Sequence, residues 1–284
     1  MLLAAAATAA VTTAFAGALA LYAHLVEPVW LTVRNIPVAV STTRGDTLRV
    51  VHISDLHWGN FVPHEYLKRS FREVARQKPD IIVITGDFIN KRLDDSTEKA
   101  DYENALRGLA RAAPTYAAPG NHDGGPWAHR IGGYETTDTV RSVLESAGIR
   151  WLENAYECLE AKGLRICVGG VGDPWARASK PGLFVGDFNA EVADFKIMLI
   201  HNPDTKELVN RDDWDLLLAG HTHGGQVNLP FVGAPWVRVG DKSMMSGLYK
   251  YAGRPLHVNP GVGHSQRRAR IGRRPEVSVL EVSL

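Results

Sequence analysis

Apolar runs and amphipathic segments alternate along residues 48–118. Short runs rich in Val and Ile predict strands at residues 48–53, 80–85 and 116–118. Between them, apolar residues recur at helical spacing over residues 66–76 and 99–112. Strands separated by helices of about three turns are typical of parallel βαβ units with right-handed crossovers. We therefore expect an α/β domain built on a parallel sheet.

The pattern changes toward β structure after residue 150. Residues 156–160 and 164–168 flank a Lys-Gly pair that is typical of a two-residue hairpin turn. This hairpin would place Cys158 opposite Cys167, where we expect two small buried thiols rather than a disulfide. Further apolar runs predict strands at residues 195–200, 216–219, 256–259 and 277–282.

The first 26 residues contain no Asp, Glu, Lys or Arg and are mostly Ala, Leu, Val and Thr. At about 1.5 Å per residue, such a helix can cross the roughly 30 Å hydrocarbon layer of a bilayer. A cleaved signal peptide is the main alternative, because Ala14, Ala16 and Ala20 offer small-residue cleavage sites. A buried helix of a soluble domain is a further alternative. The length of the run and its lack of a basic start favour an uncleaved anchor.

We therefore divide the chain into a membrane anchor (1–27), a connecting segment (28–47) and one large domain (48–284). Arg34 and Arg44 follow the apolar segment, and no Lys or Arg precedes it. By the positive-inside rule this favours a cytoplasmic domain. The expected location is the inner (cytoplasmic) membrane, crossed once.

The composition narrows the function classes only a little. With 45% hydrophobic and 22% charged residues, the chain is neither disordered nor fibrous. A formal net charge of +1 gives no bulk attraction for nucleic acid, so no nucleic-acid partner is expected. Two cysteines are too few for a thiolate zinc cluster or for a disulfide framework.

Residues that bind metals follow five of the predicted strands. In open α/β sheets, ligands bind beyond the carboxyl ends of the strands. The segments at these positions are Asp55-Leu56-His57, Gly86-Asp87, Gly120-Asn121-His122-Asp123, His201-Asn202 and Gly220-His221-Thr222-His223. Carboxylate, amide and imidazole donors without thiolates suit hard or borderline divalent ions. Together the segments predict a site that holds two such ions.

Two further expectations concern the neighbours of these residues. Glycines precede Asp87, Asn121 and His221, and they should let the chain turn without a clash at Cβ. The isolated histidines are expected to be surface or packed polar residues rather than ligands: His24, His52, His64, His129, His257 and His264.

This series of residues resembles the calcineurin-like metallophosphoesterases, whose five sequence blocks are all present and in order over residues 48–284. Gly224-Gly225-Gln226 and Arg274-Pro275-Glu276-Val277 resemble the membrane-associated or exported bacterial branch of that family. The resemblance implies an α/β fold in which two β-sheets pack as a sandwich flanked by helices. Here one N-terminal transmembrane helix would precede it.

The resemblance also implies roles for individual residues. One metal ion would be held by Asp55, His57 and His223, the other by Asn121, His201 and His221, with Asp87 bridging them. His122 would lie near the scissile phosphate as a proton donor or a stabiliser of charge, and Asp123 would orient its imidazole. The ions would be Mn, Fe or Zn. A tyrosinate like that of purple acid phosphatases is not expected, because Asn90 stands three residues after Asp87.

The expected function is hydrolysis of a phosphodiester or pyrophosphate bond by a hydroxide that bridges two metal ions. The substrate would be a phosphorylated small molecule or a lipid-linked compound near the membrane. Because the family includes enzymes of lipid A synthesis, one alternative is a UDP-2,3-diacylglucosamine pyrophosphatase. A general exported phosphodiesterase or phosphatase and a non-catalytic metal-binding scaffold are the others, although the full ligand set disfavours the scaffold. The chain contains no G-x-S-x-G elbow, P-loop or H-E-x-x-H helix.

The densest basic cluster comprises Arg267, Arg268, Arg270, Arg273 and Arg274. One interpretation is an anion clamp, since guanidinium groups suit bidentate phosphate binding. A second is a contact with anionic lipid headgroups beside the anchor. The third is a solvated loop with a structural ion pair through Glu276.

Overall fold

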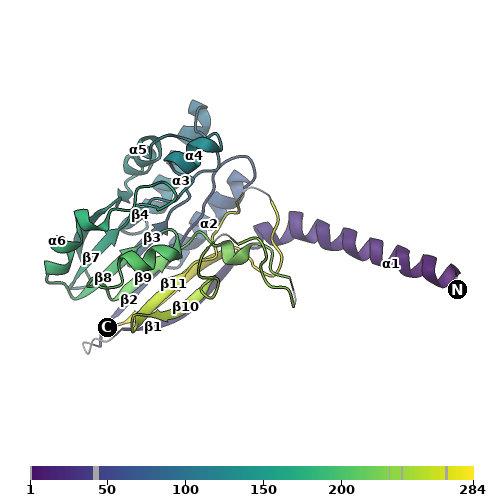
Figure 1. Cartoon of the computed structure of the whole chain (residues 1–284). Helices are drawn as coiled ribbons and strands as arrows, with labels where there is room; N and C mark the ends of the chain where they lie inside the picture. The colour runs from purple at the N-terminus through teal and green to yellow at the C-terminus, as the bar shows by residue number, and fades with distance from the viewer. Residues whose placement is uncertain (1, 41–44, 230, 238, 266–267) are drawn as a thin grey trace.

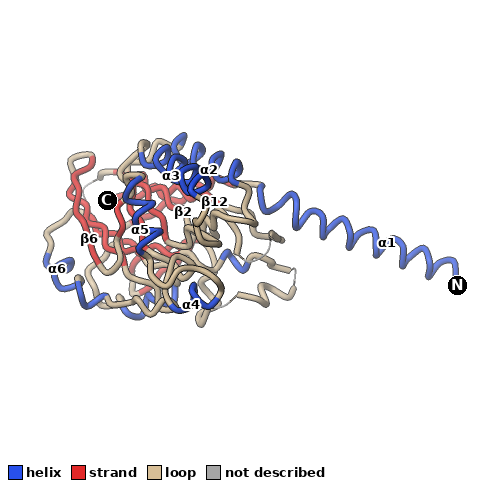
Figure 2. Tube along the Cα trace, turned by 90° about the horizontal axis from the view of Figure 1, so that it is seen from above, coloured by secondary structure: helices blue, strands red, loops and turns tan. Residues whose placement is uncertain are grey.

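Two mixed β-sheets pack face to face, and helices cover their outer faces, as the sequence predicts (Figures 1 and 2). The computed structural model describes residues 2–40, 45–229, 231–237, 239–265 and 268–284. Arg44 and Arg267, which entered the expectations on topology and on the basic cluster, lie outside these residues.

The first sheet has the strand order β1-β12-β2-β3-β4-β5. Its strands are β1 (Thr32–Ala39), β12 (Glu276–Ser283), β2 (Thr47–Ile53), β3 (Ile81–Thr85), β4 (Thr115–Ala118) and β5 (Arg150–Trp151). From β2 to β5 each neighbouring pair is parallel, whereas β12 runs antiparallel to β2. The crossovers contain the predicted helices α2 (His64–Arg76) and α3 (Ser96–Ala110). The expectation of parallel βαβ units is therefore confirmed.

Short capping and burial signals explain these elements. The carboxylate of Asp95 accepts a hydrogen bond from the Glu98 N–H and so begins α3. All five residues of β3 are buried, because helices cover one face of the sheet and the second sheet covers the other. Two further helices, α4 (Pro126–Arg130) and α5 (Asp138–Ser146), lie between β4 and β5.

Residues 28–47, which we expected to serve as a connection, contribute β1 to the first sheet. This strand pairs in parallel with β12, from Thr32 opposite Glu276 to Ala39 opposite Ser283. Within it only Ile36 and Val38 are buried, so the strand lacks the continuous apolar run that marks β3.

The second sheet has the strand order β10-β11-β9-β8-β7-β6. Its strands are β10 (Gly247–Tyr251), β11 (Arg254–Val258), β9 (Leu216–Ala219), β8 (Phe195–Leu199), β7 (Leu164–Gly170) and β6 (Ala155–Ala161). The short helix α6 (Val185–Ala190) packs Phe188 against the outer face of this sheet. Apolar side chains from both sheets, among them Val50, Ile197 and Leu218, form the core between them.

A pair of histidines joins the two sheets. His52 on β2 and His257 on β11 are both fully buried, and their Nδ1 atoms lie 2.9 Å apart. The Nε2 atom of His52 also lies 2.9 Å from the Thr85 hydroxyl oxygen. The expectation that these two histidines are packed polar residues is therefore confirmed.

The hairpin of β6 and β7 corrects one prediction. Its turn residues Lys162 and Gly163 have φ values of 53° and 74°, as a two-residue turn of this type requires. The register places Cys158 directly opposite Cys167, as expected. The two residues form a disulfide rather than two free thiols. The prediction treated each cysteine as a small apolar residue, whereas the facing register allows the sulfur atoms to bond.

The N-terminal helix α1 (Leu2–Leu21) extends away from the rest of the molecule (Figure 1). Residues Ala6–Val29 are long and apolar enough to cross a membrane, and only 6% of their most hydrophobic window is buried. A signal sequence would have the same properties. The base of the helix contacts the domain: the Arg270 N–H donates to the Ala23 carbonyl at 2.9 Å, and the Arg273 N–H donates to Glu27 Oε1 at 2.7 Å.

Candidate metal centre

Strands of both sheets deliver polar side chains to one edge of the sandwich. Asp55 and His57 follow β2, Asp87 follows β3, and the segment 121–123 follows β4. From the second sheet, His201 follows β8, while His221 and His223 follow β9. Seven of the nine predicted site residues fall into three overlapping groups whose ligand atoms lie within 4.8 Å of one another. The groups are Asp55, His57 and His223; His57, Asp87 and His122; and Asp87, His201 and His221.

The first group consists of Asp55, His57 and His223. The Nε2 atoms of His57 and His223 lie 3.1 Å apart. Asp55 Oδ1 lies 3.8 Å from the first of these atoms and 3.2 Å from the second. Three donor atoms that converge in this way suit a single divalent cation.

The second group consists of Asp87, His201 and His221. His201 Nε2 lies 3.2 Å from His221 Nδ1 and 3.3 Å from Asp87 Oδ2. The same Asp87 oxygen lies 3.6 Å from His57 Nε2, which belongs to the first group. One carboxylate oxygen therefore faces donor atoms of both groups.

Unpartnered buried atoms in this region fit a metal centre. Asp55 Oδ1 and Asn121 Oδ1 are buried and accept no hydrogen bond from any residue that the structure describes. Leaving such atoms unpaired costs about 1–3 kcal/mol each. His201 Nδ1 lies 2.6 Å from the Thr85 carbonyl oxygen, so Nδ1 carries a proton, and Nε2 can bind a cation once it gives up its own proton. This donor set fits divalent ions.

The backbone is strained at the same residues. Five predicted ligands have positive φ values between 49° and 69°: Asp55, His57, Asp87, His221 and His223. For residues other than glycine this conformation costs of order 1–3 kcal/mol and clusters at functional sites. The fold therefore holds these side chains at a cost in stability.

Two glycines allow the chain to pass through this edge. Gly86 has a φ of 80°, and a Cβ there would lie 2.7 Å from His201 Nδ1. A Cβ on Gly120 would clash with the carboxylate of Asp87. The expectation that glycines before Asp87 and Asn121 avoid such clashes is therefore confirmed. Gly86 is required by its positive φ, and Gly120 is required because the Asp87 carboxylate lies against its Cα.

The buried charges shift one another's pKa values. Burial alone would raise the pKa of Asp87, but the facing His201, His122 and His57 outweigh it and hold this pKa well below its usual range. Burial opposes protonation of His201, yet Asp87 raises its pKa well above the usual value. Burial lowers the pKa values of His57 and His223 well below the usual value. These two rings are therefore neutral, which is the form that binds metals.

His122 and Asp123 differ in what they contact. His122 Nε2 lies 3.9 Å from Asp87 Oδ2, and its ring packs edge-on against that of Trp127. We expected Asp123 to orient this imidazole. Its carboxylate instead accepts hydrogen bonds from the backbone N–H groups of Asp87, Phe88 and Gly120. Its contacts thus fix the loop that carries Asp87.

Comparison with known proteins agrees with this geometry. The family model described as "Calcineurin-like phosphoesterase" matches residues 48–225. The chain belongs to this family. It is 34% identical over 262 residues to phosphodiesterase YaeI of Escherichia coli, covering 92% of each chain.

A second relative of this calcineurin-like phosphoesterase carries a more specific name. The UDP-2,3-diacylglucosamine pyrophosphatase LpxG of Chlamydia trachomatis is 27% identical over 326 residues, covering 96% of each chain. Among solved structures, a dimetal phosphatase from Danio rerio shares 11% identity with a TM-score of 0.41, covering 76% of this chain and 88% of that one. Membership of the family makes the chain a metal-dependent phosphohydrolase and implies a dinuclear divalent site.

Sequence reasoning missed three residues beside this phosphoesterase site. Asp173 follows β7 and is 1% exposed, its Oδ2 has no hydrogen-bond partner in the described part of the chain, and burial raises its pKa to about 6. Its Gly172-Asp173 pair repeats the strand-end pattern of Gly86-Asp87, so the signal was present. Trp127 and Trp175 pack edge-on against the rings of two predicted site residues, His122 and His221. No periodicity in the sequence marks either tryptophan.

The described part of the arginine cluster is largely structural. Arg270 is fully buried, and its guanidinium donates hydrogen bonds to the carbonyls of Pro260, Gly261, Gly263 and Arg273. Arg273 donates to the Gly224 carbonyl, while the Arg274 guanidinium lies 3.5 Å from the centre of the Trp30 ring. The interpretation as a solvated loop is wrong for Arg270.

The remaining isolated histidines lie outside the three ligand groups of this site. They have other partners: Ala20 O for His24, Trp58 and Glu98 for His64, Glu135 for His129, and Phe61 O for His264.

Proposed function

We propose that this phosphoesterase hydrolyses a phosphodiester or pyrophosphate bond of a membrane-proximal substrate, using two divalent ions. The observation that carries this proposal is the position of Asp87, whose Oδ2 lies 3.6 Å from a donor atom of one ligand group and 3.3 Å from a donor atom of the other. A carboxylate shared in this way is what a two-ion centre requires.

The residues divide naturally between the two ions. One ion would be held by Asp55, His57 and His223, the other by Asn121, His201 and His221, and both by Asp87. Such ions supply Lewis acidity to phosphoryl oxygens and lower the pKa of water. Mn, Fe and Zn all suit this set of imidazole and oxygen donors.

The side chains of the protein would orient the substrate and move the proton. His122 would donate a proton to the leaving oxygen, a role supported by its Nε2, which lies 3.9 Å from Asp87 Oδ2. Asp123 would act indirectly, by positioning Asp87, since its carboxylate accepts hydrogen bonds from the backbone N–H groups of Asp87 and Phe88. Trp127 and Trp175, whose ring centres lie 5.8 Å apart, would form an apolar wall against the leaving group.

We further propose that α1 anchors the chain in the membrane with the catalytic domain on the extracytoplasmic side. Disulfides persist in oxidising compartments and are rare in the cytosol. The bond between Cys158 and Cys167 therefore outweighs the few arginines that favoured a cytoplasmic domain. One of those arginines, Arg34, lies within β1. A topology reporter fused to the C-terminus tests this proposal, and activity of a cytoplasmic reporter alone would refute it.

A second candidate activity is the pyrophosphatase reaction on UDP-2,3-diacylglucosamine. The similarity to LpxG along 96% of both chains favours it. It would require access to a nucleotide-linked lipid, so the topology experiment also bears on this choice.

The activity test compares bis-p-nitrophenyl phosphate with p-nitrophenyl phosphate as substrates. The full chain is used in detergent, because Ala23 and Glu27 contact the domain. Metal-stripped protein receives Mn²⁺ or Zn²⁺, and His122→Ala is the matched variant. We expect metal-dependent cleavage of the diester that falls by about 10²-fold or more in the variant. Two bound ions per chain without turnover of either ester or of UDP-2,3-diacylglucosamine would favour the scaffold.

A further inference from the structure

We propose that the loop joining η5 (His223–Gly225) to β10 is a second membrane-contacting element, which inserts its apolar tip into the bilayer that α1 enters. This inference rests on the proposed anchor. The occupant of the surface is the interfacial layer of a lipid bilayer. We call residue 229 and residues 231–236 of this loop the apolar tip.

The apolar tip exposes large hydrophobic side chains to an unusual degree. Phe231 is 108% exposed relative to a reference residue, Trp236 is 68% exposed and Val232 is 66% exposed. Moving such apolar surface out of water and into an apolar phase is favourable. Soluble proteins rarely gather such residues on one loop unless the loop binds a partner or a membrane.

The tip is held in shape by its own backbone. The Leu229 N–H donates to the Gly233 carbonyl and the Gly233 N–H donates to the Leu229 carbonyl, both at 2.9 Å. This closed turn carries Phe231 and Val232 outward. A tip that is already formed loses little conformational entropy when it enters an apolar phase.

The stem of this loop lies beside the base of α1. The Asn228 N–H donates to the Ile271 carbonyl at 2.8 Å, and the Ile271 N–H donates to the Gln226 carbonyl at 3.0 Å. The neighbouring Arg270 N–H donates to the Ala23 carbonyl in the last turn before the domain. In both views, loops next to the base of α1 extend from the domain in the same general direction as α1 (Figures 1 and 2). A bilayer that contains α1 would therefore meet the apolar tip.

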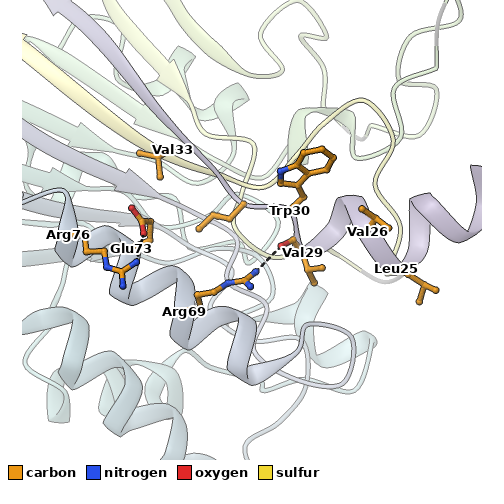
Figure 3. A pocket seen from close by; sticks show the side chains of 9 residues that line it. Leu25, Val26, Val29, Trp30, Val33, Arg69, Glu73 and Arg76 are labelled. Carbon is orange, nitrogen blue, oxygen red and sulfur yellow. Dashed lines mark hydrogen bonds and ion pairs between the residues drawn. The ribbon is translucent and has the colours of Figure 1, made fainter.

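The surface around the base of α1 has the chemistry of a membrane interface. Leu25, Val26 and Trp30 are about half exposed and line an open groove together with Arg69, Glu73 and Arg76, of which Glu73 and Arg76 form an ion pair (Figure 3). Apolar and aromatic residues next to arginines are typical of the headgroup layer, where guanidinium groups meet lipid phosphates. The groove and the stem of this loop thus both adjoin the base of α1, and the groove and the apolar tip both expose apolar side chains.

The apolar tip is also coupled to the metal centre by the chain itself. The loop leaves directly from His223, a predicted ligand, and a Cβ on Gly225 would clash with the Ala234 side chain. Contact of the tip with lipid would therefore hold the metal centre close to the bilayer surface. A phosphate ester attached to a lipid could then reach the site without leaving the membrane.

The test measures lipid contact and needs no activity. In Phe231→Cys the new thiol is the only reactive one, because Cys158 and Cys167 are bonded to each other. An environment-sensitive dye is attached there, and the full chain is reconstituted into vesicles of phosphatidylethanolamine and phosphatidylglycerol that carry nitroxide-labelled acyl chains. Val192→Cys is the matched control: Val192 is 86% exposed and lies just after α6, at the end of the molecule opposite α1 (Figure 1). Trp236→Cys gives a second position on the loop.

We expect blue-shifted emission and strong quenching by the nitroxide lipids at positions 231 and 236, with neither change at position 192. Equal signals from the tip labels and the control would overturn the proposal. Blue-shifted emission without quenching would mean that protein covers the tip, which overturns it as well. Failure of the chain to float with the vesicles would refute both the anchor and the membrane contact. Metal-dependent diester cleavage is measured separately, so its loss would not be mistaken for loss of lipid contact.

Discussion

Replacing Arg270 by Met tests whether one buried guanidinium supports both the fold and the metal centre. Burial lowers the pKa of Arg270 to about 10, so the side chain is charged at neutral pH. It donates to four carbonyls, and one of its terminal nitrogens lies 3.4 Å from His223 Nδ1. The methionine would fill much of the space but could not donate hydrogen bonds.

The magnitude follows from the acceptors left behind. A buried carbonyl that loses its donor costs about 1–3 kcal/mol. Gly261 keeps a second donor, the Glu276 N–H at 3.2 Å, so three carbonyls carry most of the loss. Part of the cost is recovered because no charge is buried any longer. We expect Arg270→Met to reduce the free energy of unfolding by about 3–5 kcal/mol.

The assay is urea denaturation of the full chain in detergent, followed by tryptophan fluorescence, together with titration of metal-stripped protein with Mn²⁺. Arg274→Met is the matched control, because this exposed arginine stacks on Trp30 and should contribute less than about 1 kcal/mol. Arg270→Met should also weaken binding of one Mn²⁺ ion more than the other, since only one group contains His223. A loss of stability no larger than that of Arg274→Met would refute the reasoning.

Three further predictions concern the metals, the disulfide and the buried histidines. Chelation of the metal ions should lower the thermal midpoint of unfolding, and Mn²⁺ at 100 times its dissociation constant should restore about 2.7 kcal/mol of the free energy of unfolding. Asp87→Ala should abolish this recovery. An unchanged recovery in that variant would contradict the assignment of Asp87 as the carboxylate shared by both ions. Cys158→Ser should cost about 2–3 kcal/mol of stability, since the bridge closes a short loop between residues nine apart; a wild-type chain whose mass does not change on reduction would contradict the bond. Burial lowers the pKa of His257 to about 3, whereas in the unfolded chain it is about 6.5. The unfolded state therefore binds more protons between these values, so stability is complete above about pH 6.5 and falls by about 1.4 kcal/mol for each pH unit below it. His257→Gln should remove this share of the slope in urea titrations of metal-free protein, and an identical slope would count against it.

Continuous burial made the central strands predictable. β3 and β9 are covered on both faces, so their sequences are almost wholly apolar and their ends are clear. β2 and β8 are also largely buried, although Arg49, His52 and Lys196 interrupt their apolar runs. The metal-type residues were predictable for the same reason, since they follow those ends. β1 and β10 face solvent on one side, and their mixed patterns gave no comparable signal.

Contacts distant in sequence were not predictable from local patterns. The pairing of Arg270 with carbonyls and the packing of Trp175 on His221 depend on how loops from different strands meet. The prediction of two free cysteines was wrong for another reason. The register of the hairpin was predicted correctly, but the residues next to Cys158 do not determine whether it is oxidised. Asp123 illustrates a third limit, because a carboxylate next to a histidine can bind backbone N–H groups instead of the ring.

The contact between Ala23 and Arg270 divides the N-terminal segment into a dispensable part and a structural part. A peptidase that cut after Ala14, Ala16 or Ala20 would leave this contact and the Glu27–Arg273 hydrogen bond in place. The released chain would then keep the support of its metal-binding loop. A cut beyond Ala23 would remove the carbonyl that accepts the hydrogen bond of the Arg270 backbone N–H. The same domain would then exist either bound to the membrane or released from it. The position of the cut would decide whether the released form keeps the hydrogen bonds that Ala23 and Glu27 make to the domain.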